Sequence, residues 1–312
     1  MTIHFQAKHP TGFTVNSPLQ PVVFPDGAVH VSGAYEETRY DYQIADVRGL
    51  SHDDLFVLGM WSEACEQRRE AKVLILPYLP GARMDRGVPN GAAVYGSYIS
   101  SFVAPDQIIT IDPHSPDALR SFFPTLGRET TVFPVERIIR KALQDPSRDD
   151  QPQKYVGVIA PDKGAHERAS RAAHVMGVPV YQAGKTRDFN TGKLSGFHME
   201  DELPAEGKLL IVDDLCDGGG TFIGLAEATG LPKERLDLWV THGVFSKGVN
   251  VLEPHFGEVH TTDSYYSGPS LTMKDDERDG KRAIDFKVVV HPLTPYLYPE
   301  IDHKRLAPQI TN

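Results

Sequence analysis

The residues with the clearest chemical capacity lie between positions 208 and 222, in the stretch KLLIVDDLCDGGGTF. An apolar run ends in two adjacent carboxylates, Asp213 and Asp214. Glycines after such a run let the backbone approach a phosphate closely, and the N–H groups of a following helix attract anions. Carboxylates at a strand end suit sugar hydroxyls, bound directly or through a hydrated divalent metal. The stretch therefore predicts a sugar-phosphate site, whose loop residues are Asp217, Gly218, Gly219, Gly220 and Thr221. A tight turn beside a solvated acidic pair is the alternative.

A second candidate site follows the apolar run from Lys72 to Tyr78. The sequence PYLPGARMDRG contains Arg83, Asp85 and Arg86 among prolines and glycines, a composition that continues neither a helix nor a strand. Ligands of open α/β sheets bind outside the carboxyl ends of the strands, so a basic loop there is a candidate phosphate site. Taken alone, two such arginines are more often solvated surface charges. A DPH turn at residues 112–114 also follows a predicted strand, QIITID.

The sequence predicts an α/β architecture for the helices and strands that must position these residues. Short apolar runs alternate with longer segments of helical period, which is typical of a mostly parallel sheet flanked by helices. The clearest helix is predicted over residues 51–71, opened by a capping box between Ser51 and Asp54. Its apolar face is formed by Leu55, Leu58, Trp61 and Cys65.

Other elements follow the same rhythm. Helices are predicted over residues 92–102 and 166–176, and Gly177 can end the second in the left-handed conformation. Strands are predicted at 72–78, 107–112, 155–160, 178–184, 208–215, 236–245 and 258–262.

The chain is long enough for two domains. It has 312 residues, and the polar segment LQDPSRDDQPQK at 143–154 separates two regions that each read as repeated βα units. We therefore expect one domain over residues 1–148 and a second over 149–312, each a mostly parallel sheet flanked by helices.

Composition excludes several classes of protein. The formal charge of −10 has the wrong sign for coating nucleic acid. No apolar run approaches the roughly 20 residues that span a bilayer, and the first residues carry no signal-peptide pattern. With Cys65 and Cys216 as the two cysteines, no disulfide framework is expected. We expect a cytoplasmic protein that binds neither nucleic acid nor membrane.

Five segments together resemble the ribose-phosphate pyrophosphokinase family, and they occur in that family's order. FPDGAVHV is similar to its FxDGE segment, PYLPGARMDRG to PYxxYxRQDR, TIDPH to DxH, IAPDKGAHERA to SPDxGxxxRA, and DDLCDGGGT to its phosphoribosyl pyrophosphate signature. The resemblance implies two domains of the type I phosphoribosyltransferase fold. It also implies transfer of the diphosphoryl group of ATP to the anomeric hydroxyl of ribose 5-phosphate, giving phosphoribosyl pyrophosphate and AMP.

The same resemblance assigns roles to individual residues. Catalysis falls to Lys185 and Arg187, which match the KxR of the family's mobile loop, and to His114. Mg²⁺ would be held by Asp112, His114 and Asp162, with a water-mediated role equally open for the histidine. The nucleotide contacts implied are Phe24, Asp26, Arg83, Asp85, Arg86 and His114. The ribose 5-phosphate contacts implied are Asp162, Asp213, Asp214, Asp217, Gly218, Gly219, Gly220 and Thr221.

Departures from the family pattern keep alternatives open. Met84 stands where the family has Gln, and Ala28 where it has Glu, so nucleotide choice is in question. The alternatives are a phosphoribosyltransferase that consumes phosphoribosyl pyrophosphate and a catalytically silent regulatory member. In the family the FxDG segment reaches a neighbouring subunit, which implies at least a homodimer. Residues after about 240 match too weakly to carry any role over.

Overall fold

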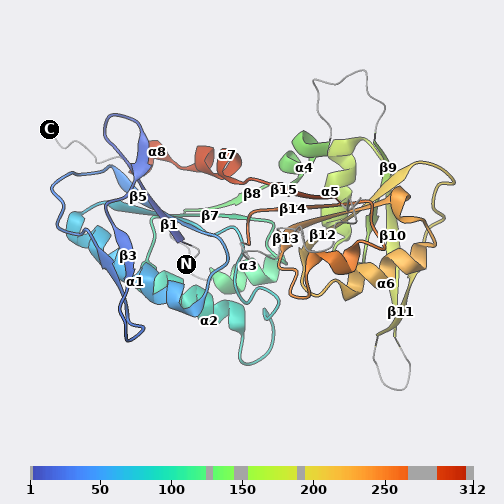
Figure 1. Cartoon of the computed structure of the whole chain (residues 1–312), viewed down its shortest axis with the longest axis horizontal. Coiled ribbons are helices and arrows are strands. Elements are labelled where there is room, and N and C mark those ends of the chain that lie inside the picture. The colour runs from blue at the N-terminus through green and yellow to red at the C-terminus, as the bar shows by residue number, and fades with distance from the viewer. Residues whose placement is uncertain (1–2, 124–128, 144–153, 188–193, 266–286, 307–312) are drawn as a thin grey trace, which may run out of the picture. The chain divides into compact units, whose positions relative to one another are not determined.

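The chain folds into two α/β units in the computed structural model, which describes residues 3–123, 129–143, 154–187, 194–265 and 287–306. Unit 1 comprises residues 1–133 and 294–312, and unit 2 comprises residues 134–293. Each unit contains a mostly parallel sheet with helices on its faces (Figure 1). The predicted fold class, two mostly parallel sheets flanked by helices, is confirmed.

The sheet of unit 1 has the strand order β2-β1-β5-β6-β7-β8. Its parallel part consists of β5 (Tyr42–Val47), β6 (Ala71–Ile75), β7 (Gln107–Ile111) and β8 (Glu129–Phe133). An antiparallel edge is added by β1 (Ile3–Lys8) and β2 (Thr14–Asn16), and β3 (Gln20–Val23) pairs with β4 (Val29–Ser32) in a separate hairpin.

Helix α1 (His52–Arg68) begins and packs as predicted. The Asp54 amide donates to Ser51 Oγ at 3.2 Å, and the Ser51 amide donates back to Asp54 Oδ2 at 2.8 Å. Its apolar face packs on the sheet together with α2 (Gly91–Tyr98), the π-helical turn η1 (Ile99–Val103) and α3 (Pro116–Phe122). Leu58, Trp61 and Cys65 are fully buried there, whereas Leu55 is partly buried.

The last described residues return to unit 1, which differs from the expected boundary at residue 148. They form α7 (Thr294–Leu297), η6 (Tyr298–Glu300) and α8 (His303–Leu306). The buried Gln107 amide fixes them, because it donates to the Glu300 carbonyl at 2.8 Å and accepts from the Asp302 amide at 2.9 Å. Helix α4 (Glu136–Leu143) belongs to unit 2 instead, because it packs on α5. The polar segment predicted as the boundary lies mostly outside the described residues.

The sheet of unit 2 has the strand order β11-β10-β9-β12-β13-β14-β15. All neighbours are parallel except the pair β10 and β11. The strands are β9 (Tyr155–Ala160), β10 (Val180–Arg187), β11 (Leu194–Met199), β12 (Lys208–Cys216), β13 (Leu236–Gly243), β14 (Glu258–Thr262) and β15 (Lys287–His291).

Helices cover both faces of this sheet (Figure 1). Helix α5 (His166–Met176) lies with α4 on one face and ends at Gly177, whose φ of 67° is the predicted left-handed cap. Helix α6 (Gly220–Thr229) packs on the other face. The short turns η3 (Lys233–Arg235) and η4 (Val249–Leu252) complete the described helices of unit 2. In the part of the chain that the structure describes, no helix is long and apolar enough to cross a membrane.

Candidate active site

The glycine loop follows β12 at the carboxyl edge of the unit 2 sheet, as predicted. Gly219 takes φ = 80° and is the N-cap of α6. A Cβ on Gly219 would lie 3.2 Å from side-chain atoms of both Val251 and Leu252, whereas a Cβ on Gly220 would meet nothing within 4 Å. Gly219 is therefore required by the backbone and by the packing of η4, and the open side of the loop lies at Gly220.

Asp213 and Asp214 are held by one buried cation, Arg168 of α5. Arg168 Nη1 lies 3.3 Å from Asp213 Oδ1 and 3.5 Å from Asp214 Oδ1. Burial, and then repulsion by Asp214, raises the pKa of Asp213 well above its usual value, although Arg168 opposes the shift. The two adjacent carboxylates thus share one guanidinium, and Asp213 Oδ1 also accepts from the Asp214 amide at 2.8 Å.

Asp162 and Lys185 form an ion pair at the same edge of the sheet, which the sequence had assigned to two different segments. Asp162 follows β9, and its Oδ1 accepts from the Ala165 amide at 3.0 Å. Burial raises the pKa of Asp162, but the bonds from Lys185 and from backbone amides outweigh burial and lower it overall. Arg187 is the last residue of β10, and its side chain lies outside the described residues.

The arginine loop and the DPH turn of unit 1 are joined through Asp85. Ser115 Oγ donates to Asp85 Oδ2 at 2.7 Å, and Asn90 Nδ2 donates to the Asp85 carbonyl at 3.0 Å. Arg83 and Arg86 are exposed, and Arg86 forms long ion pairs, at 3.8 Å to Asp85 Oδ1 and 3.6 Å to Asp117 Oδ2. Asp85 is thus a structural anchor, while the guanidinium groups remain accessible to a ligand.

Asp112 and His114 do not form the extended pair that their spacing suggested. Strand β7 ends at Ile111, and Asp112 takes φ = 45°, so the alternation of side chains in a strand stops before it. Asp112 is buried and His114 is exposed. Residues two apart in an extended strand turn their side chains to one side, and the left-handed backbone at Asp112 breaks this relation between Asp112 and His114.

Phe24 and Asp26 lie at the turn between β3 and β4. Asp26 Oδ1 accepts from the Ala28 amide at 3.0 Å, and the Phe24 ring lies 6.3 Å from that of His30. Phe24 is 48% exposed. The aromatic side chain is thus presented at a hairpin tip, where it can contact a ligand or another chain.

Two groups of predicted residues result, one in each unit. Unit 2 brings Asp162, Lys185, Asp213, Asp214 and the glycine loop to one sheet edge. Unit 1 joins the arginine loop to the DPH turn. Sequence reasoning missed Arg168, although it belongs to the segment IAPDKGAHERA that was singled out.

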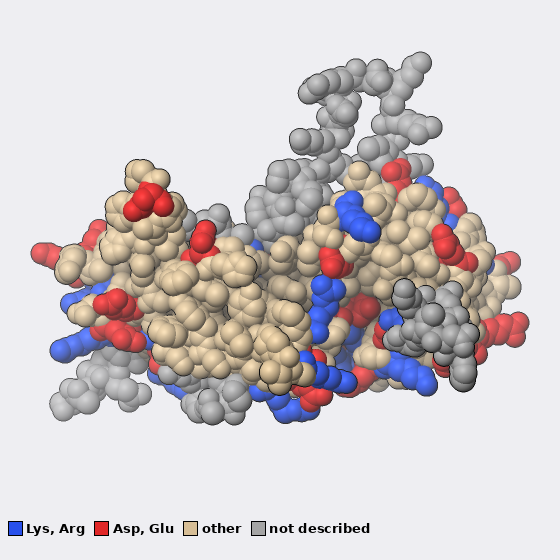
Figure 2. Space-filling view, turned by 90° about the horizontal axis from the view of Figure 1, so that it is seen from below, with Lys and Arg blue, Asp and Glu red and all other residues tan. Residues whose placement is uncertain are grey.

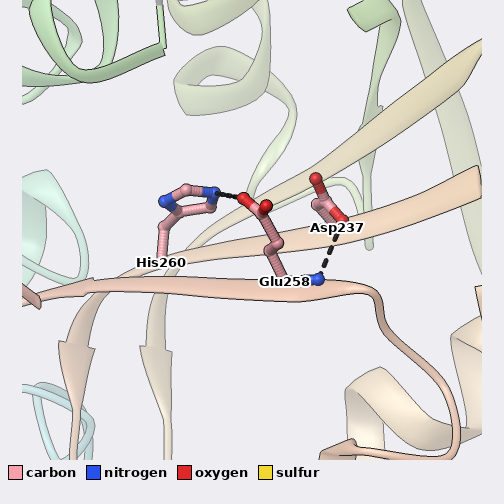
Figure 3. Close-up of side chains that lie close together, drawn as sticks. All are labelled: Asp237, Glu258 and His260. Carbon is pink, nitrogen blue, oxygen red and sulfur yellow. Dashed lines mark hydrogen bonds and ion pairs between the residues drawn. The ribbon is translucent and has the colours of Figure 1, made fainter. Parts of the chain in front are cut away.

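An acidic cluster at the opposite, amino edge of the unit 2 sheet was also not predicted. Ligand atoms of Asp237, Glu258 and His260 lie within 4.8 Å of one another, in the spacing that a metal ion could use. Figure 3 shows Glu258 beside His260, with its backbone amide bonded to Asp237. The Asp237 oxygens also accept from Tyr155, Lys154 and Lys208, at 2.7, 3.2 and 3.0 Å. These lysines already supply positive charge, so the cluster is an ionic network.

Comparisons with known proteins give the class of the fold. Residues 132–230 match the family described as "Phosphoribosyl transferase domain", a span that includes the glycine loop. The crystal structure of phosphoribosylpyrophosphate synthetase from Mycobacterium smegmatis resembles the chain with a TM-score of 0.65 and 20% identity, covering 92% of this chain and 89% of that one. This likeness concerns the fold.

Curated relatives then identify the family. The ribose-phosphate pyrophosphokinase of Thermococcus kodakarensis is 31% identical over 232 residues, 72% of this chain and 77% of that protein. That of Sulfurisphaera tokodaii is 28% identical over 263 residues, 81% of this chain and 87% of that protein. The chain belongs to the ribose-phosphate pyrophosphokinase family, as a divergent member.

Proposed function

We propose that the chain transfers the diphosphoryl group of ATP to ribose 5-phosphate, giving phosphoribosyl pyrophosphate and AMP. In this reaction the anomeric oxygen bonds to the β-phosphorus, the bond from that phosphorus to the α,β-bridging oxygen breaks, and AMP leaves. The proton of the anomeric hydroxyl passes to solvent or to a neighbouring carboxylate. Such transfers depend chiefly on alignment and on neutralising charge on the phosphate oxygens.

The observation that carries the proposal is the arrangement at the carboxyl edge of unit 2. Asp213 and Asp214 share one guanidinium, so they can accept bonds from ribose hydroxyls, while the amides of the glycine loop can bind the 5-phosphate. Lys185 lies on the neighbouring segment, paired with Asp162. A nucleotide phosphate that competes with Asp162 for Lys185 would free this cation for the charge that develops during transfer.

The nucleotide contacts proposed in unit 1 are Arg83 and Arg86. Both guanidinium groups are exposed, and a guanidinium can bind phosphate oxygens in pairs or stack on a base. Asp85 fixes the loop between them through Ser115. Phe24 and Asp26, at the exposed hairpin, are proposed to complete a nucleotide site.

Magnesium is proposed as the cofactor. Asp213 and Asp214 can offer adjacent carboxylate oxygens to a hydrated divalent cation, because both side chains lie against the single guanidinium of Arg168. Asp112 and His114 are the proposed holders on the nucleotide side. Asp162 fits less well, since its oxygens already accept from Lys185 and a backbone amide. The ion, when bound, would neutralise phosphate charge, and the protein residues would align the two substrates.

A homodimer is proposed to form through an uncharged face of unit 1. Residues 91–104, which form α2 and η1, contain no charged side chain. Val94 and Phe102 are each 63% exposed and Phe56 of α1 is 60% exposed, with the Tyr98 and Phe102 rings stacked at 4.8 Å. Figure 2 shows a broad area of uncharged atoms on this side. Since each chain carries a charge of −10, two copies meet with least repulsion through such a face.

The dimer proposal has a direct test in solution. Val94→Asp with Phe102→Asp should give a monomer in sedimentation velocity, whereas Phe13→Asp, at an exposed site in the β1–β2 turn, should leave the oligomer unchanged. A wild-type monomer at micromolar concentration would reject it.

The reaction is tested by incubating the purified chain with ATP, ribose 5-phosphate and Mg²⁺ and assaying AMP together with phosphoribosyl pyrophosphate. Equal amounts of both products are expected. Formation of neither product, with ribose 5-phosphate still bound, would favour a silent regulatory member. Consumption of added phosphoribosyl pyrophosphate with a nucleobase would favour a phosphoribosyltransferase.

A further inference from the structure

Lys247 lies over the glycine loop without belonging to it. It follows β13, in a segment hydrogen-bonded to the loop: the Phe245 amide donates to the Cys216 carbonyl at 3.1 Å, and the Ser246 amide donates to the Asp217 carbonyl at 3.2 Å. The Lys247 Cδ and Cε atoms lie 3.3 Å from the place that a Cβ on Gly218 would occupy. Its ammonium nitrogen is one bond, about 1.5 Å, beyond Cε, and so lies within reach of the loop.

Two other cations at this edge already hold carboxylates. Arg168 pairs with Asp213 and Asp214, and Lys185 pairs with Asp162. For Lys247, which is exposed, the described residues provide no hydrogen-bond or ion-pair partner.

The carboxylates at this edge would repel a phosphate group unless a cation lies close to it. Four carboxylates, those of Asp162, Asp213, Asp214 and Asp217, lie at this edge, and two of them share the single guanidinium of Arg168. A phosphate dianion approaching this edge meets net negative charge, which backbone amides and the start of α6 offset only in part. An unpaired ammonium beside the glycines offsets the rest.

We propose that Lys247 is a binding residue for the phosphate group of the sugar, with its stem passing over Gly218 and its ammonium contacting the phosphate oxygens. The inference rests on the proposed function in that the ligand is ribose 5-phosphate. It goes further by assigning selectivity for a phosphorylated sugar to a residue outside the glycine loop. The absence of a side chain at Gly218 then has a second purpose, since it leaves room for the lysine stem.

Calorimetric titration with ribose 5-phosphate, inorganic phosphate and ribose tests this assignment. Lys247→Met keeps the aliphatic stem and removes the charge. It should lower the affinity for ribose 5-phosphate and for inorganic phosphate about tenfold and leave the affinity for ribose unchanged. Lys163→Met is the matched control, because Lys163 is exposed in the turn after β9 at the same edge. It should change these affinities less than about twofold.

Gly218→Ala supplies an independent variant. Its methyl group would occupy the place of the lysine stem. Gly218→Ala should therefore lower the affinity for ribose 5-phosphate when Lys247 is present, and should lower it little further in the Lys247→Met background. Unchanged affinity in a folded Lys247→Met variant, or an equal loss in Lys163→Met, would overturn the assignment. Wild-type protein that binds inorganic phosphate but not ribose 5-phosphate would reject the proposed function, while Lys247→Met would still decide whether this lysine binds the anion.

Discussion

The two edges of the unit 2 sheet both gather carboxylates and cations, yet they differ in what the carboxylate oxygens contact. At the amino edge, the fully buried Asp237 accepts four bonds, from two lysines, a tyrosine and a backbone amide. At the carboxyl edge, Asp213 and Asp214 share Arg168 at 3.3 and 3.5 Å, and Asp213 Oδ1 also accepts from the Asp214 amide at 2.8 Å. The lysines therefore hold Asp237 more closely than Arg168 holds Asp213 and Asp214, and this difference favours the carboxyl edge as the proposed ligand site.

The largest expected effect is at the carboxyl edge. Lys185→Ala should lower kcat by about 10²–10³, because the loss of one electrostatic donor to a transition state has this size. The apparent affinities for ATP and ribose 5-phosphate should change less than roughly tenfold, about 1.4 kcal/mol. Arg187→Ala is expected to behave alike, and steady-state kinetics with thermal unfolding as a folding control measures both. A normal kcat in either variant would show that the replaced side chain is a surface charge without a role in the transfer.

The second effect concerns the amino edge and should be structural. Asp237→Ala leaves Tyr155, Lys208 and the Glu258 amide without their acceptor, so the free energy of unfolding should fall by about 3 kcal/mol. The kcat of the folded fraction should stay unchanged. Urea unfolding measures the loss, and Lys287→Ala, at an exposed partner of Glu258, should cost less than about 0.5 kcal/mol. A large fall in kcat at full folding would make this edge part of the active site.

A third contrast extends the comparison to the carboxyl edge of unit 1. His114 is exposed and follows β7, so His114→Ala should leave stability unchanged. If His114 helps to hold magnesium, turnover should fall about 10–100-fold and recover in part at higher metal concentration. Kinetics across a magnesium titration measures this. Wild-type turnover at every magnesium concentration would remove His114 from the metal site.

The smallest effect is a pH dependence at His291, the last residue of β15, whose ring stacks on that of His260. Burial first, and then His260 and Lys287, lowers the pKa of His291 to about 4. As the pH falls from about 6.5 to about 4, the unfolded chain takes up a proton that the folded imidazole refuses, so stability decreases. Partial exposure limits the loss to about 1–2 kcal/mol.

His291→Phe is the matched variant for that pH dependence, because it keeps the stack on Trp239 at 5.1 Å and removes the titration. Its stability should vary less between pH 6.5 and 4 than that of the wild type in urea unfolding. The pKa of Glu258 is lowered chiefly by the bond to His260, so this carboxylate also stabilises the folded chain. That contribution to the free energy of unfolding is lost only at lower pH. Equal slopes in both proteins would assign the pH dependence to other groups.

Local sequence patterns predicted what local physics determines. The capping box of Ser51 and Asp54, the left-handed cap at Gly177 and the glycine loop after β12 each depend on a few adjacent residues. A side chain at Gly219 would meet Val251 and Leu252, so a substitution there would disturb the packing of η4. Gly220, beside open space, is the better probe of the anion.

Long-range contacts could not be read from the sequence. The bond between Tyr155 and Asp237 joins residues 82 positions apart, and that between Gln107 and Glu300 spans 193. The ion pair of Asp162 with Lys185 likewise depends on how a parallel sheet aligns the ends of its strands. The left-handed backbone at Asp112 overrode the alternation expected of a strand, because the turn begins one residue earlier than the pattern suggested.

The return of residues 294–306 to unit 1 has a consequence for how the protein is made. The chain leaves the ribosome with its N-terminus first. All of unit 2 therefore emerges before the segment that bonds to Gln107 and Tyr42. During synthesis unit 2 can fold while unit 1 still exposes the polar groups that its last helices will satisfy. A chain that ends at residue 293 should therefore show protease protection in unit 2 and not in unit 1.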